Sequence, residues 1–146
     1  MSLDIFLIEN INDKHIDWQN KKTISINEAG SMIGLIPIIE QYYEGYKPND
    51  HNILYHDNIT HNLNVMAEKA GIYKHLWRPD EINIKYADEL IIPLKNGLKL
   101  LNDDPDYYIM FNAINGWGIY ENLILFVKNY IDACILYPDS IIEVDR

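Results

Sequence analysis

Cysteine is almost absent from this chain of 146 residues, with Cys134 as its only example. A single thiol excludes an internal disulfide and any zinc site built from cysteines. No apolar run approaches the length of about 18 residues that marks a membrane-spanning helix, so the sequence predicts no membrane-spanning role. The first residues also lack the basic stretch and apolar core of a secretion signal, and a cytoplasmic location is therefore expected.

Basic residues are scarce relative to acidic ones. The chain has 12 lysines and arginines against 22 aspartates and glutamates, which gives a formal net charge of −10. This charge repels nucleic acids and anionic membranes, so no direct nucleic-acid binding is expected. It attracts a basic protein partner, although many small proteins are acidic without such a partner.

Familiar catalytic and nucleotide-binding motifs are missing as well. The chain contains no phosphate-binding loop, no Gly-x-Gly-x-x-Gly and no Gly-x-Ser-x-Gly. Its five histidines show no recognised metal-ligand spacing, since His56 and His61 are five residues apart and a helical ligand pair needs three or four. The sequence therefore predicts no catalytic residue, no cofactor and no bound metal.

The chain does contain the apolar patterns of a packed α+β domain. Hydrophobic residues make up 48% of it, and its length fits a single domain over residues 1–146. A β-rich run that is apolar on both faces predicts a strand over residues 3–9 and places it inside the sheet and not at its edge. Further strands are predicted over residues 23–27, 52–57 and 141–145, the first and last of these from alternating patterns. Helical spacing predicts helices over residues 60–70, 86–102 and 119–136, and another that begins near residue 36. Gly71 is expected to end the first of them. The side of the last helix that is expected to face inward consists of Leu123, Phe126, Val127, Tyr130, Ile131 and Cys134, and its outward side includes Asn122 and Asn129. The expected fold is a small, mainly antiparallel sheet of about four strands, covered on one face by three to four helices.

One polar cluster lies over residues 51–62, at a predicted junction between a strand and a helix. We expect His56 and Asp57 to end the strand and the helix to begin at Thr60. The candidate ligand-binding residues here are Asn58, Thr60, His61 and Asn62. Free N–H groups at a helix start attract anions. Alternatively, Asn58 or Thr60 caps the helix and satisfies those groups internally.

A second polar cluster lies over residues 112–121, where the last helix begins. Its candidate binding residues are Asn115, Gly116, Trp117 and Tyr120. Glycines on both sides of Trp117 permit a binding loop with close backbone approach. Alternatively, Trp117 fills a gap between the helix and the sheet. Arg78 is the candidate cation of the site.

Both clusters place amide side chains at helix starts, so we expect them to share one pocket, with Trp117 or Tyr120 on its wall. The competing hypothesis is that each segment only caps its own helix and that Trp117 has a structural role. It predicts that Trp117→Ala costs about 3–5 kcal/mol of stability.

Several short motifs resemble an uncharacterised family of small proteins from bacteriophages, prophages and bacteria. They are Asn-Ile-Thr-His-Asn-Leu at 58–63, Ala-Gly-Ile-Tyr-x-x-Leu-Trp-Arg-Pro at 70–79, Asn-Gly-Trp-Gly-x-Tyr-Glu at 115–121 and Tyr-Pro-Asp at 137–139. The resemblance covers residues 52–146. It implies a phage or mobile-element context and carries no activity or catalytic residue with it.

The expected function is a non-enzymatic binding protein, an accessory or counter-defence factor. Its partner would be a small anionic, nucleotide-like ligand or a host protein that it blocks. Two alternatives are an acidic inhibitor or immunity protein that docks on a basic enzyme, and a small hydrolase that uses His56, Asp57 or His61.

Overall fold

The computed structural model describes residues 1–11 and 53–146. The chain divides into one unit of residues 1–8 and 54–146 and another of residues 9–53, and the fold below is that of the first unit. The predicted strand over residues 23–27 and the predicted helix near residue 36 lie outside the described residues. That residues 1–146 form a single domain stays a prediction.

A three-stranded antiparallel sheet forms the base of the unit. Its strands are β1 (Ser2–Ile8), β2 (Ile53–Thr60) and β3 (Ile141–Asp145), in the order β2-β1-β3. Ile5 of β1 lies opposite Val144 of β3. The apolar first strand therefore occupies the centre of the sheet, as its sequence predicts.

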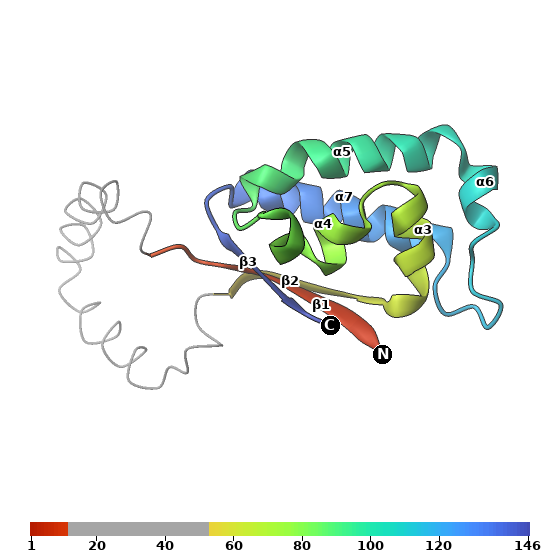
Figure 1. The fold of residues 1–146 in the computed structure, drawn as a ribbon, viewed down its shortest axis with the longest axis horizontal. Helices are drawn as coiled ribbons and strands as arrows, with labels where there is room; N and C mark the ends of the chain where they lie inside the picture. Colours follow the sequence, from red (N-terminus) through yellow and green to blue (C-terminus); the bar gives the residue numbers. More distant parts are fainter. Residues whose placement is uncertain (12–52) are drawn as a thin grey trace, which may run out of the picture. The chain divides into compact units, whose positions relative to one another are not determined.

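The helices lie on one side of this sheet (Figure 1). In chain order they are η1 (His61–Leu63), α3 (Asn64–Lys69), α4 (Tyr73–Trp77), η2 (Pro79–Ile82), α5 (Asp88–Asp103), α6 (Pro105–Ile109) and α7 (Tyr120–Leu136), where η marks a 3-10 helix. The α+β prediction is confirmed. None of the helices in the described ranges is long and apolar enough to cross a bilayer.

The core lies between the sheet and the helices. In β1 the side chains of Leu3, Ile5 and Leu7 are fully buried, while the residues between them are half-buried on the opposite face. Alternate side chains of a strand point to opposite faces, so this pattern shows which face the helices cover. Helix α7 contributes the buried stripe that its periodicity predicts: Leu123, Phe126, Val127, Tyr130, Ile131 and Cys134.

Cys134 is expected to be inert towards thiol reagents in the folded protein. Burial, with a smaller contribution from the charge of Asp88, raises the pKa of Cys134 to about 12. The thiol is thus both protonated and inaccessible, and the thiolate is the reactive form. A disulfide reagent followed by absorbance should label the chain only in denaturant. Rapid stoichiometric labelling in native buffer would contradict the burial of this face of α7.

Candidate functional site

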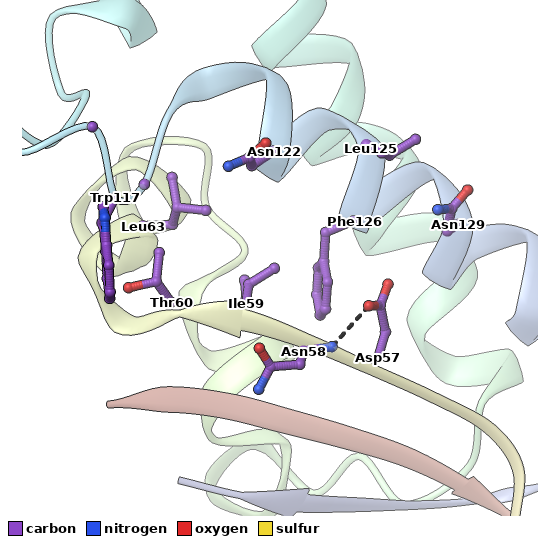
Figure 2. A pocket seen from close by; sticks show the side chains of 12 residues that line it. Asp57, Asn58, Ile59, Thr60, Leu63, Trp117, Asn122, Leu125, Phe126 and Asn129 are labelled. Carbon is purple, nitrogen blue, oxygen red and sulfur yellow. Dashed lines mark hydrogen bonds between the residues drawn. The ribbon is translucent and has the colours of Figure 1, made fainter.

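A cleft lies between helix α7 and strand β2, and we call it the β2–α7 cleft (Figure 2). Its volume is about 490 Å³. It is lined by Asp57, Asn58, Ile59 and Thr60 of β2, by Leu63 of η1, by Gly116, Trp117 and Gly118 before α7, and by Asn122, Leu125, Phe126 and Asn129 of α7. Among the strands that the structure describes, β2 is terminal in the sheet order, so one long wall of the cleft is a sheet edge.

Helix α7 supplies the opposite wall from one face. Asn122, Leu125, Phe126 and Asn129 follow the i, i+3, i+4, i+7 spacing that places side chains on the same side of a helix. Phe126 is buried, whereas Asn122, Leu125 and Asn129 are exposed. In Figure 2, Asn122 stands towards the Thr60 end of β2 and Asn129 towards the Asp57 end. The wall therefore has two apolar side chains in its middle and an amide at each end.

The segment before α7, residues 112–118, is named here the Trp117 loop. It is held by its own asparagines. Asn112 Oδ1 accepts a hydrogen bond from the backbone N–H of Tyr120 at 2.7 Å, and Asn115 Oδ1 accepts one from that of Trp117 at 2.9 Å. These N–H groups are thus satisfied within the chain, which is the capping alternative for this segment.

The Trp117 loop is also tied to the other predicted cluster. Asn62 Nδ2 donates a hydrogen bond to the backbone oxygen of Trp117 at 2.7 Å. Gly118 lies so close that a Cβ built on it would be 2.9 Å from Cβ of Asn62. The expectation that the two segments lie together, with Trp117 on the wall of a shared pocket, is confirmed.

The Trp117 side chain is 73% exposed. The hypothesis that this ring fills a gap between helix and sheet is therefore wrong. Leu125, across the cleft, is 59% exposed, and Ile114 of the same loop is fully exposed. Large apolar side chains gathered in solvent around a cleft indicate a surface that contacts another molecule.

The predicted junction at Asn58 requires correction. Strand β2 continues to Thr60, so His56 and Asp57 do not end it, and Asn58 lies within the strand. Pairing with β1 extends to the end of β2, because His61, the residue directly after the strand, still donates its N–H to the backbone oxygen of Met1 at 3.3 Å. Asn58 caps no helix, and its Nδ2 donates to Asp4 Oδ1 at 3.1 Å.

Thr60 is the residue that caps the helix start. Its Oγ1 accepts from the backbone N–H of Asn62 at 3.3 Å. The side chain thus occupies an N–H group that an anion would need, and the capping alternative holds here too.

His61 and Tyr120 have structural contacts and do not line the β2–α7 cleft. His61 Nδ1 accepts a hydrogen bond from Trp77 Nε1 at 2.8 Å. Tyr120 is buried, and its hydroxyl donates to the backbone oxygen of Leu101 at 2.6 Å. Both side chains thus use a polar atom for a hydrogen bond within the fold.

Arg78 is likewise absent from the lining of the cleft. Its guanidinium forms an ion pair with Glu81 at 3.1 Å and donates to the Tyr73 hydroxyl at 3.4 Å. The structure therefore gives the cleft no cation from this residue.

The three residues of the hydrolase alternative do not converge. His56 stacks on Phe6 at 4.6 Å between ring centroids, and its Nε2 lies 3.0 Å from Asp4 Oδ1. Asp57 follows it in the strand and so points to the opposite face. His61 is engaged by Trp77. Within residues 1–11 and 53–146, no group of three or more metal-ligating side chains is arranged to hold an ion.

Among the residues that the structure describes, Asp57 is the only charged one that lines the cleft. Its Oδ1 accepts from the N–H of Asn58 at 2.8 Å and its Oδ2 from the Tyr55 hydroxyl at 3.1 Å. Burial, then the charge of Asp57, raises the pKa of Tyr55 above its ordinary value, so this hydroxyl stays protonated and keeps donating. No basic residue of the described ranges forms an ion pair with Asp57. The cleft is thus a negative, amide-rich site.

The α7 wall was not among the predicted site residues. The periodicity of α7 correctly places Asn122 and Asn129 on its outward side. The sequence contained one sign of this wall, namely Leu125. It is an apolar residue on the outward, polar side of α7, and it lies between two asparagines that are seven residues apart. It could not be read as a cleft because the opposing wall comes from β2, more than sixty residues earlier.

Comparisons of the chain with protein-family models, with curated proteins and with solved structures found no match.

Proposed function

We propose that this chain is a non-enzymatic binding protein that captures a segment of a basic partner protein in the β2–α7 cleft. The observation that carries the proposal is the exposed Trp117 ring on the wall of a cleft that is otherwise lined mainly by amides and apolar side chains, with the carboxylate of Asp57 among them. Tryptophan at the centre of an interface is a frequent source of binding energy, because it buries a large apolar area at little entropic cost.

The chemistry of the cleft favours a polypeptide over a small anion. Asparagine amides both donate and accept hydrogen bonds, which matches the alternating N–H and C=O groups of a peptide backbone. A phosphate would instead meet the Asp57 carboxylate, and the helix-start N–H groups of Asn62 and Tyr120 are taken by side chains. The net charge of −10 adds attraction for a basic partner.

The resemblance of the short motifs to phage and bacterial proteins suggests the biological context in which such a binding protein would act. An acidic protein encoded by a phage or mobile element would act by occupying a basic surface of a host protein. This context supports an inhibitor or accessory factor more than an enzyme.

Selection from a library of random peptides displayed on phage tests the proposal. We expect the protein to select basic peptides that contain a large apolar residue. Trp117→Ala should weaken their binding by at least about tenfold, as truncation of an interface tryptophan does. The matched control is Ile92→Ala, because Ile92 of α5 is 70% exposed and does not line the cleft. The selected peptides should bind this variant like the parent.

Salt provides the second measurement. Association should slow as ionic strength rises, since steering by the charge of the protein is screened. Peptides that bind Trp117→Ala and the parent equally well would contradict the proposal, as would selection of acidic peptides.

A further inference from the structure

The outer edge of β2 forms one wall of the β2–α7 cleft. Within the sheet that the structure describes, β2 pairs with β1 alone, and no strand of the described residues lies beside its other edge. An unpaired edge presents a row of backbone N–H and C=O groups that another extended chain can join. If the chain captures a partner segment in the cleft, as the proposed function has it, this edge determines how that segment binds.

The direction of each backbone group of β2 follows from its contacts. His61 donates its N–H to Met1 at the β1 side. Successive residues of a strand alternate in direction, so His56, Asn58 and Thr60 turn their backbone groups to the outer edge. In agreement, the N–H of Asn58 is bonded by the side chain of Asp57 and not by β1. The backbone groups of β2 that could bond a partner strand therefore lie along this wall of the cleft.

The Asp57 carboxylate opposes the pairing of another strand with this edge. It occupies the N–H of Asn58 and places a negative charge beside the open row. Charged side chains of this kind discourage pairing between sheet edges in general. A lysine or arginine of the partner, drawn to Asp57, would offset that charge and free the N–H for a peptide carbonyl.

The α7 wall matches an extended segment in length and chemistry. Asn122 and Asn129 are seven residues apart, which corresponds to about 10 Å along a helix. An extended chain covers that distance in roughly three residues. Side chains of such a segment alternate, so those that face α7 would meet Leu125 and the Trp117 ring, with amides on either side.

We infer that the partner segment adds to the sheet as an extra strand at the outer edge of β2, with a lysine or arginine against Asp57 and a large apolar side chain against Trp117 and Leu125. The occupant is an extended, basic segment of another protein. Its backbone supplies hydrogen bonds to β2, and its alternate side chains supply selectivity against α7.

A scan of backbone N-methylation on the tightest peptide from the selection tests this mode. Each methyl group removes one N–H donor and leaves the side chains unchanged. Strand addition predicts a loss of about tenfold or more at every second position and little loss between them, because only alternate backbone groups face β2. A loss that does not alternate would overturn strand addition while the peptide still bound, so the proposed function would survive.

A double-mutant cycle tests the contact between Asp57 and the basic residue of the peptide. The protein variant is Asp57→Asn, and in the peptide the lysine is replaced by norleucine. Each change alone should weaken binding by about tenfold, and the two together by little more than either, as expected for groups in direct contact. Independent, multiplying losses would contradict the assigned position of the basic residue.

A second copy of the chain is the competing occupant of the edge. In that case the protein would sediment as a dimer, Trp117→Ala would dissociate it, and the peptides would fail to bind. That result would overturn the inference together with the proposed function.

Discussion

Replacing Trp77 by alanine is expected to lower the free energy of unfolding by about 3–5 kcal/mol, the range found for truncation of buried aromatic residues. Trp77 is 2% exposed, stacks on Tyr73 with 5.4 Å between ring centroids and donates its Nε1 proton to His61. The substitution leaves a cavity in the core and removes the donor that His61 Nδ1 uses. Urea denaturation followed by circular dichroism measures the loss.

Trp117→Ala is the matched substitution, because the two side chains are identical and their surroundings are opposite. With Trp117 73% exposed, its truncation should change the stability by less than about 0.5 kcal/mol, as surface substitutions usually do. Comparable losses for the two variants would mean that Trp117 packs in the core, and they would remove the basis of the proposed binding surface.

Gly118→Ala is expected to displace the Trp117 loop and to destabilise the protein by about 2–5 kcal/mol, from backbone strain and overpacking together. Gly118 has φ of +118°, which side chains rarely tolerate, and its added Cβ would lie 2.9 Å from Cβ of Asn62 and 3.3 Å from Cγ2 of Thr60. The loop can relieve that overlap only by moving away, which breaks the bond between Asn62 and the Trp117 backbone. Binding of the selected peptides should fall with it.

Gly116→Ala separates strain from overlap. Gly116 also has a positive φ of +77°, yet an added Cβ there meets no atom within 4 Å. Its cost should be confined to the strain of the left-handed conformation, about 1–2 kcal/mol. Urea denaturation gives both stabilities, and the NMR signal of the Trp117 indole reports the loop. If Gly118→Ala proves no more disruptive than Gly116→Ala, the close docking of the loop on η1 is incorrect.

The elements that the sequence predicts well are those whose apolar periodicity is long and local. The apolar run of β1 and the helical stripes of α5 and α7 are local patterns, so the type and approximate limits of these elements follow without knowledge of their neighbours. Gly71, with φ of +76°, ends the helical segment that begins after β2, as its position predicts. The short helices α4 and α6 were not predicted, because five residues contain too little of a helical period.

By itself, then, the sequence determined the α+β class, the central position of β1, the buried stripe of α7 and the two amide-rich segments. Tertiary structure decided which side chains of those segments face solvent. Trp77 and Trp117 are indistinguishable as residue types, and only the packing of α4 against the core and the docking of the Trp117 loop on Asn62 bury one and expose the other. The same holds for Asn58. The sequence pattern predicted it at a helix start, whereas pairing of β2 with β1 keeps it within a strand. Long-range contacts made these choices because burial depends on residues that are distant along the chain, and local periodicity contains no information about them.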